Sequence, residues 1–264
     1  MISPTERMIA QKDGAIGWMT FNNPERRNAL SLDMWQAIPV ILDHFDRDAE
    51  VRVIVLKGAG DKAFVSGADI SQFEKQRSSP ESIAQYDAVA EQASMKLAEI
   101  RKPTIAMIHG FCIGGGVGIA LQCDLRIAAD TARFGVPAAR LGLGYRWGGV
   151  KKLVDLVGPS FAKEIFFTAR HFSAAEALTM GLINRALPEA ELETYVRGYC
   201  AMMADNAPLT MEAVKGVVSE LAKPGPQIDR TRCETLVARC FGSQDYIEGR
   251  RAFMEKRKPV FAGK

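Results

Sequence analysis

Short apolar strands alternate with amphipathic helices along the chain up to about residue 190. The strongest strand pattern is Val51–Leu56, a nearly continuous apolar run that ends at Gly58-Ala59-Gly60. Ile16–Phe21, Thr104–Ile108 and Leu125–Ala129 are shorter strands of the same kind. Continuous apolar strands are buried on both faces, which is typical of parallel sheets joined by helical crossovers. The sequence therefore predicts an α/β fold.

Helical patterns fill the gaps between these strands and dominate after Pro188. Ser31 precedes one helix, Ser78–Glu81 begins another, and Ser173 with Glu176 forms a capping box three residues apart. The segment from Gly110 to Gly116 is expected to be a turn, with a helix following it over Val117–Leu121, and the pattern becomes helical again near residues 160–186. Leu192–Ala204, Leu209–Leu221, Arg230–Phe241 and Ile247–Lys258 are the expected C-terminal helices. We therefore predict a core over residues 1–190 and a helical region over residues 191–264.

The composition excludes several classes of protein. The net charge of +3 gives no reason to expect nucleic acid as a partner. No apolar run approaches the roughly 20 residues of a membrane helix, so no membrane partner is expected. The five cysteines are scattered and odd in number, and the chain shows no secretory signal, which favours reduced thiols and a cytoplasmic location. The three histidines have no metal-ligand spacing, so no metal site is predicted.

Two short segments carry the features expected of a functional site. Residues 62–70 (KAFVSGADI) follow the strand Val51–Leu56, and residues 109–118 (HGFCIGGGVG) join a strand to a helix. A triple glycine at a helix start lets a ligand approach the backbone, and the unpaired N–H groups there can hold an anion or an oxyanion. A close-packed turn without a ligand explains the glycines equally well. The spacing fits neither the phosphate loop of nucleotide-binding proteins nor the dinucleotide fingerprint.

Together, the two segments resemble those of the enoyl-CoA hydratase/isomerase (crotonase) family. The shared patterns are AF-x-x-GAD-I and, about 40 residues later, P-x-I-A-x-I-x-G-x-x-x-GGG. Further matches, in the same order along the chain, are PERRNALS at 24–31, CDLRIA at 123–128, FG at 134–135, LG at 141–142, 173–182, EG at 248–249 and AFMEKR at 252–257. The resemblance runs from about residue 10 to the C-terminus.

The resemblance implies a spiral of repeated ββα units with a helical C-terminal trimerisation region, assembled as a homotrimer or a dimer of trimers. It implies an acyl-CoA substrate, with coenzyme A as part of the substrate and no tightly bound cofactor. The implied oxyanion-hole donors are the backbone N–H groups of Ala68 and Gly115. The residues implied to contact coenzyme A are Arg27, Ala29, Ser66, Ala68, Asp69, Ile70, Phe253 and Lys256, the last two closing over the nucleotide from the same or a neighbouring subunit.

The chain departs from the family at the residues that move protons. Typical hydratases of the family carry two glutamates, and the matching positions here are Gly118 and Ala138. Since neither residue carries a proton, the usual hydration mechanism is expected to fail. Some isomerases and a dehalogenase of the family place an acid slightly further along the chain, and Arg146 occupies that position here.

Three functions remain open at this point. The first is an enoyl-CoA hydratase/isomerase-family lyase or isomerase that holds a thioester oxyanion. The second is a malonyl-type acyl-CoA decarboxylase, because methylmalonyl-CoA decarboxylases of the family resemble this chain in having a tyrosine at Tyr145. In that reaction, loss of CO2 creates the enolate without a base, Tyr145 orients the carboxylate and Arg146 binds it. The third is an acyl-CoA binding protein without catalysis.

Overall fold

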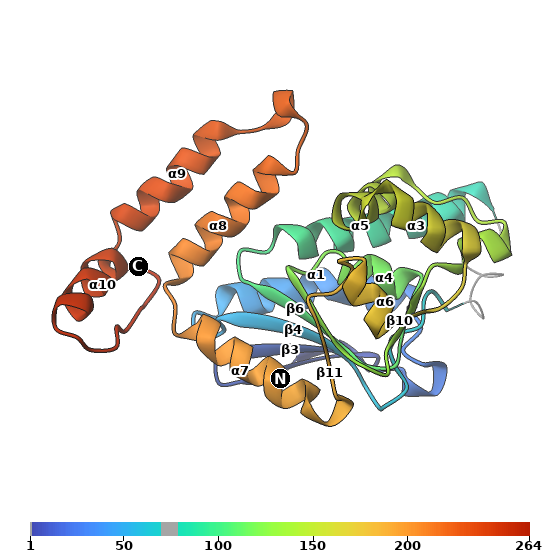
Figure 1. Cartoon of the computed structure of the whole chain (residues 1–264), viewed down its shortest axis with the longest axis horizontal. Coiled ribbons are helices and arrows are strands. Elements are labelled where there is room, and N and C mark those ends of the chain that lie inside the picture. Colours follow the sequence, from blue (N-terminus) through green and yellow to red (C-terminus); the bar gives the residue numbers. More distant parts are fainter. Residues whose placement is uncertain (1, 70–78) are drawn as a thin grey trace.

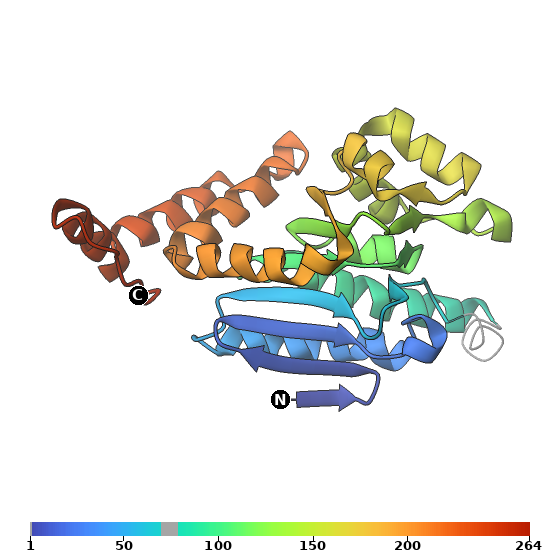
Figure 2. The same cartoon turned by 60° about the horizontal axis from the view of Figure 1, so that its bottom comes forward.

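The computed structural model describes residues 2–69 and 79–264, which form two sheets with helices between and around them (Figures 1 and 2). The larger sheet has the strand order β1-β2-β3-β4-β6-β8-β11. Its strands are β1 (Ile2–Thr5), β2 (Met8–Asp13), β3 (Ile16–Phe21), β4 (Val53–Gly58), β6 (Thr104–Ile108), β8 (Leu125–Ala129) and β11 (Arg185–Leu187). The pairs β1–β2 and β2–β3 are antiparallel, and the pairs from β3 to β11 are parallel.

The smaller sheet has the order β10-β9-β7-β5. Its strands are β5 (Ala63–Val65), β7 (Phe111–Ile113), β9 (Arg133–Gly135) and β10 (Phe172–Ser173). β5, β7 and β9 directly follow β4, β6 and β8 along the chain, so each turn of the chain adds one strand to each sheet before a helix or loop returns. This is the predicted spiral of ββα units.

The helices connect the turns of the spiral and then form the C-terminal region. They are η1 (Pro24–Arg26), α1 (Leu32–Arg47), α3 (Pro80–Glu99), α4 (Gly115–Ala120), η3 (Pro137–Leu141), α5 (Trp147–Thr168), α6 (Ala174–Thr179), η4 (Glu189–Glu191), α7 (Leu192–Ala204), α8 (Pro208–Leu221), η5 (Gly225–Gln227), α9 (Arg230–Phe241) and α10 (Gln244–Met254).

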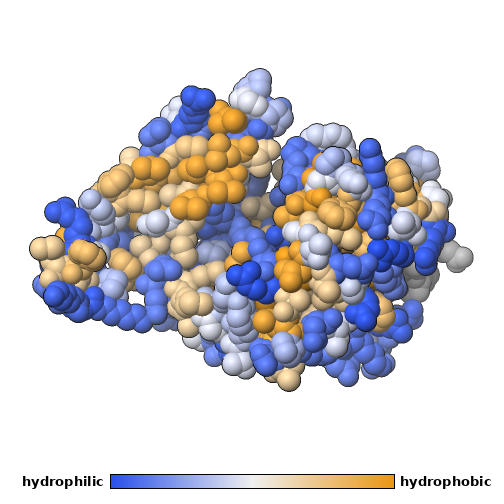
Figure 3. All heavy atoms as spheres, viewed as in Figure 1, coloured by the Kyte–Doolittle hydropathy of each residue, from blue (hydrophilic) through white to orange (hydrophobic). Residues whose placement is uncertain are grey.

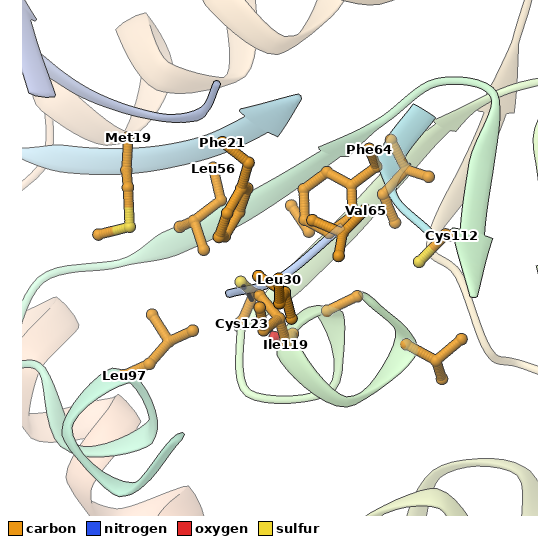
Figure 4. Packing of buried hydrophobic residues seen from close by; sticks show 14 of the residues in the cluster. Met19, Phe21, Leu30, Leu56, Phe64, Val65, Leu97, Cys112, Ile119 and Cys123 are labelled. Atoms are coloured by element: carbon orange, nitrogen blue, oxygen red, sulfur yellow. Dashed lines mark hydrogen bonds between the residues drawn. The ribbon is translucent and has the colours of Figure 1, made fainter. Parts of the chain in front are cut away.

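Strand β4 shows why the larger sheet is buried on both faces. Ile54 and Leu56 face the main core, which also contains residues of α1, α3, α4 and the smaller sheet. Val53 and Val55 face the opposite side, where they pack with buried residues of α7. This alternation follows from the two-residue period of a strand. Figure 4 shows part of the main core, including Phe21 and Phe64. Their rings pack edge to face with 5.6 Å between the ring centroids.

The sequence predicted the longer helices and the strands β3, β4, β6 and β8, but it missed β1, β2, β11 and the strands of the smaller sheet. Two predicted elements are shifted: the strand expected at Val51–Leu56 is β4 at Val53–Gly58, and the helix expected at Ile247–Lys258 is α10 at Gln244–Met254. The segment from Gly110 to Gly116 is not one turn, because β7 lies within it and α4 already begins at Gly115. The helix expected near residue 160 begins at Trp147 and bends at Gly158, where φ is 76°. The capping box of Ser173 and Glu176 is confirmed. Ser31 is at the N-cap of α1, but its hydroxyl donates to Asp33 instead of capping a backbone N–H.

The helices after β11 divide into two groups. α7 lies along the face of the larger sheet, whereas α8, α9 and α10 extend away from it (Figures 1 and 2). The sequence-based boundary at residue 190 thus falls just before a helix that packs on the core. Within the described part of the chain, no helix combines the length and apolar character needed to cross a membrane.

Candidate active site

The two segments singled out in the sequence meet at a cavity of about 500 Å³. Its wall is built from five parts of the chain: the start of α1, the segment after β5, the N-terminal half of α3, the start of α4, and the stretch from η3 to α5. The lining residues are Leu30, Trp35, Ser66, Gly67, Ala68, Ile83, Tyr86, Asp87, Ala90, Ile113, Gly114, Gly115, Val136, Pro137, Ala138, Leu141, Leu143, Gly144, Tyr145, Arg146 and Gly149. The lining is mostly apolar, with a few polar groups.

Ala68 and Gly115 present neighbouring backbone N–H groups at this wall. A β-carbon built on Gly115 would lie 3.9 Å from the backbone nitrogen of Ala68. Ala68 forms a parallel bridge with Leu30, in which Gly67 O accepts from Leu30 N–H and Leu30 O accepts from Asp69 N–H. That bridge leaves the N–H of Ala68 itself pointing to the other side. Gly115 begins α4, where an N–H has no acceptor within the helix.

In the part of the chain that the structure describes, neither N–H group has a backbone acceptor. Across residues 2–69 and 79–264, no backbone carbonyl accepts a hydrogen bond from Ala68 N–H or Gly115 N–H. Two fixed donors on one wall, one of them at the positive end of a helix, can stabilise negative charge on an oxygen placed between them.

The glycine-rich segment adopts this geometry because two of its residues have no side chain. Gly114 has a φ of 54° and a ψ of −110°, a conformation that L side chains rarely adopt, and its N–H donates to Gly135 O at 2.8 Å. Gly116 packs against the backbone of β5, where a β-carbon would meet Val65 O at 2.2 Å. The close approach of α4 to β5 places Gly115 beside Ala68.

Tyr145 and Arg146 lie in the same wall. The Tyr145 ring packs edge to face on Phe166 with 4.9 Å between the ring centroids, and burial raises the pKa of its hydroxyl. Arg146 is largely exposed and pairs with Asp87 of α3, its Nε and Nη2 lying 3.0 and 2.5 Å from the same carboxylate oxygen. This pair raises the pKa of the guanidinium, so Arg146 stays a cation.

The sequence-based prediction missed the contribution of α3 to the site. Ile83, Tyr86, Asp87 and Ala90 follow helical spacing and place one face of α3 on the cavity. Trp35 Nε1 donates to the Tyr86 hydroxyl at 2.8 Å, and both residues line the cavity. The helical spacing of these four residues is visible in the sequence, but polar residues such as Tyr86 and Asp87 on one helix face are equally typical of a solvent-exposed surface.

The two positions that lack the glutamates of the family differ in their surroundings. Ala138 is buried in η3 and lines the cavity. Gly118 lies one turn into α4, outside the set of lining residues, and a β-carbon there would meet no atom within 4 Å. Each position therefore has room beside it, and neither residue present supplies a proton-transferring group.

The residues predicted to contact coenzyme A are only partly brought together. Ser66 lines the cavity, and its hydroxyl donates to Arg26 O at 3.3 Å. Asp69 and Ala29 are buried, and each is next in the chain to a lining residue, Ala68 and Leu30 respectively. Arg27 is exposed, with its guanidinium 5.2 Å from the centre of the Phe111 ring. Ile70 falls outside the described residues.

Phe253 and Lys256 do not reach this cavity within one copy of the chain. Phe253 is 83% exposed at the end of α10 and lines a separate apolar groove formed with α8 and α9. Lys256 follows it, with a φ of 53° and its N–H bonded to Phe253 O. Their predicted role at the nucleotide thus requires a neighbouring copy of the chain.

Asp124, Cys112 and Cys123 also lie in or near the glycine-rich part of the chain, and they have structural partners or are buried. Asp124 accepts from the N–H and hydroxyl of Thr104 and from Lys215 of α8, all within 2.9 Å. Cys112 and Cys123 are buried, which raises the pKa of both thiols, that of Cys123 to about 12. Among the described residues, no cluster of three or more His, Cys, Asp or Glu residues is arranged to hold a metal ion.

Comparison with known proteins gives consistent matches over nearly the whole chain. A family model described as enoyl-CoA hydratase/isomerase matches residues 11–264. The short-chain-enoyl-CoA hydratase of Clostridium acetobutylicum is 34% identical over 258 residues, 95% of each chain. The crotonyl-CoA hydratase of Syntrophomonas wolfei is also 34% identical, over 98% of this chain and 99% of that protein. The structure of a putative enoyl-CoA hydratase/isomerase family protein from Hyphomonas neptunium superposes with a TM-score of 0.94 at 34% identity, covering 100% of both chains.

Proposed function

The chain belongs to the enoyl-CoA hydratase/isomerase family, and we propose that it binds acyl-CoA thioesters and stabilises a thioester oxyanion or enolate with the backbone N–H groups of Ala68 and Gly115. The observation that carries this proposal is the position of these two donors. They lie side by side on one cavity wall, and across the described residues no backbone carbonyl accepts from either. Preorganised donors of this kind contribute most where charge develops in the transition state; losing one typically costs about 10²–10³ in rate.

The largely apolar wall suits the acyl part of such a substrate. Leu30, Ile83, Leu141 and Leu143 line the cavity together with the oxyanion donors. Ser66, Ala29, Arg27 and the segment around Asp69 are proposed to contact the coenzyme A part. In this proposal coenzyme A arrives and leaves with the substrate, and no tightly bound cofactor takes part.

A turnover assay followed by mass spectrometry tests the proposal. The panel contains crotonyl-CoA, a long-chain 2-enoyl-CoA, a 3-enoyl-CoA, malonyl-CoA and methylmalonyl-CoA. We expect conversion of at least one thioester and slow hydration of the 2-enoyl esters, because Gly118 and Ala138 carry no acid. If no member of the panel is bound or converted, the proposal is wrong. Tight binding without any conversion would favour a non-catalytic acyl-CoA binding protein.

Decarboxylation of a malonyl-type ester is the second candidate. It is favoured by the position of Tyr145 and Arg146, which line the same cavity as the oxyanion donors. An incoming carboxylate must share Arg146 with Asp87, which already occupies the Nε and Nη2 donors. Release of CO2 from malonyl-CoA that Tyr145→Phe and Arg146→Ala both reduce would support this assignment, and undiminished release from both variants would refute it.

Assembly and location complete the proposal. We propose a trimer or a dimer of trimers held by the C-terminal helices. Its support is the apolar surface over α8 and α9 visible in Figure 3. The exposed apolar residues of these helices and α10 include Val214, Val218, Leu221, Phe241, Phe253 and Met254. Light scattering after size-exclusion chromatography measures the mass directly, and a monomer would contradict this part. The cytoplasmic location expected from the sequence stays a prediction.

A further inference from the structure

Asp87 supplies a carboxylate to a cavity whose two expected glutamate positions are Gly118 and Ala138. It is the one acidic residue among the described residues that line this cavity. It comes from α3, on a helix face that also carries Ile83, Tyr86 and Ala90 into the wall. The carboxylate therefore shares a wall with the proposed oxyanion donors although it is distant from them in sequence.

Arg146 holds this carboxylate through one of its two oxygens. Its Nε and Nη2 both donate to Oδ2 of Asp87, at 3.0 and 2.5 Å. The guanidinium does not bind Oδ1, so the lone pairs of Oδ1 can accept a proton or a hydrogen bond from another group. Two donors on one oxygen anchor Oδ2 more firmly than a single donor does, and they leave Oδ1 outside the pair. Arg146 is thus a positioning residue for Asp87.

The other titratable groups of the wall are less suited to remove a proton. Burial raises the pKa of the Tyr145 hydroxyl, which keeps its proton and favours a role as donor. The hydroxyl of Tyr86 accepts a hydrogen bond from Trp35 Nε1. Arg146 is a cation with no lone pair to offer.

We propose that Asp87 is the acid–base residue of this site and that the reaction it serves is a 1,3-proton shift in an enoyl thioester; this rests on the proposed acyl-CoA function. Asp87 takes a proton from C2 of a 3-enoyl thioester. The C2–H electron pair forms the enolate, whose oxygen is held by Ala68 and Gly115. The same carboxyl group returns the proton to C4, and the double bond moves from C3=C4 to C2=C3. One carboxylate suffices because the proton that leaves is the proton that returns.

The number of carboxylates separates this reaction from hydration. Adding water requires one group to activate the water and a proton to be delivered to carbon, which the resemblance assigns to two glutamates. The described lining of this cavity has one carboxylate. We therefore expect isomerisation of a 3-enoyl-CoA to exceed hydration of the matching 2-enoyl-CoA.

The test compares Asp87→Asn with a matched control on the same helix. Asparagine keeps the size of the side chain and an oxygen that accepts from Arg146, but it cannot carry the proton. Glu91→Gln removes a charge one turn further along α3, from an exposed residue that also acts electrostatically on Arg146 but does not line the cavity. Isomerisation of a 3-enoyl-CoA and deuterium incorporation from D2O are followed by mass spectrometry, and binding of the thioester by calorimetry.

We expect Asp87→Asn to lower kcat by about 10² or more, with thioester affinity changed little, since a positioned acid–base group typically contributes about 10²–10⁴-fold. Glu91→Gln should behave as the wild type, and Asp87→Glu should recover part of the rate, which shows that a loss in Asp87→Asn is not misfolding. If Asp87→Asn isomerises the thioester as fast as the wild type, the assignment of Asp87 is wrong, while the proposed acyl-CoA function still stands. A wild-type protein that neither binds nor converts the thioester would overturn the proposed function, and the role of Asp87 with it.

Discussion

Gly116 lies against the backbone of Val65 so closely that a β-carbon on it would sit 2.2 Å from the Val65 carbonyl oxygen. This contact joins α4 to β5 and sets the position of Gly115, the next residue toward the N-terminus. The spacing of the proposed oxyanion donors therefore depends on a glycine that is not itself a donor.

Gly116→Ala is expected to destabilise the protein by about 1–3 kcal/mol, because overpacking a rigid backbone contact forces α4 and β5 apart. Gly118→Ala is the matched control on the same helix. A β-carbon at Gly118 meets no atom within 4 Å, so this change should leave stability unchanged or raise it by about 0.4–1 kcal/mol. Urea unfolding measures both, and equal effects of the two substitutions would contradict the packing argument.

Restoring carboxylates at the two vacant positions should increase hydration. Gly118→Glu places its side chain in open space, and Ala138→Glu places one directly at the cavity wall. Since an acid–base group contributes about 10²–10⁴-fold, the double variant should hydrate crotonyl-CoA at least about tenfold faster than the wild type. Gly148→Glu, another exposed site with open space, serves as the control. If the wild type already hydrates crotonyl-CoA rapidly, another group supplies the base.

Glu220 should make stability depend on pH in acid. Its side chain is fully buried, and Lys223 Nζ, Asp229 N–H and Arg232 Nη1 all donate to it at 2.8–3.0 Å. These donors lower its pKa from 4.5 to about 2. A lowered pKa stabilises the folded state at pH values above the unfolded pKa, and the effect disappears as pH falls from 4.5 toward 2.

Glu220→Gln should therefore destabilise the protein at neutral pH, and the difference from the wild type should shrink as the pH falls through that window. Glu234→Gln, an exposed glutamate on α9, provides the control. Thermal melting at a series of pH values gives the comparison. A difference between wild type and Glu220→Gln that stays constant down to the lower end of the window would show that ionisation of Glu220 is unrelated to its contribution.

The five thiols should differ in reactivity toward iodoacetamide. The reacting species is the thiolate, and burial raises the pKa of Cys123 and Cys200 to about 12. Cys112 is likewise buried, whereas Cys233 and Cys240 are partly exposed. Peptide mass spectrometry of the native protein should find label first at Cys233 and Cys240, and all five should react in denaturant. Early labelling of Cys112 would mean that the strand β7 opens readily.

Much of the fold follows from local patterns that the sequence displays. Ile16–Phe21, Thr104–Ile108, Leu125–Ala129, Leu192–Ala204 and Arg230–Phe241 are predicted with the bounds that the structure has. One error lies where local signals compete. Phe111–Ile113 forms a strand between glycines that read as a turn, because pairing with β5 and β9 outweighs the local preference.

The sequence by itself determined the family resemblance, the two segments that carry Ala68 and Gly115, and the absence of glutamates at 118 and 138. Only the tertiary structure decided which side chains share the cavity. Asp87 and Arg146 are 59 residues apart, and their contact depends on how α3 and the start of α5 stack over the sheets. It also decided that Phe253 lies on a separate groove. Periodicity and motifs report on neighbours along the chain, whereas a site is assembled by packing between distant turns of the spiral, and no local pattern encodes that.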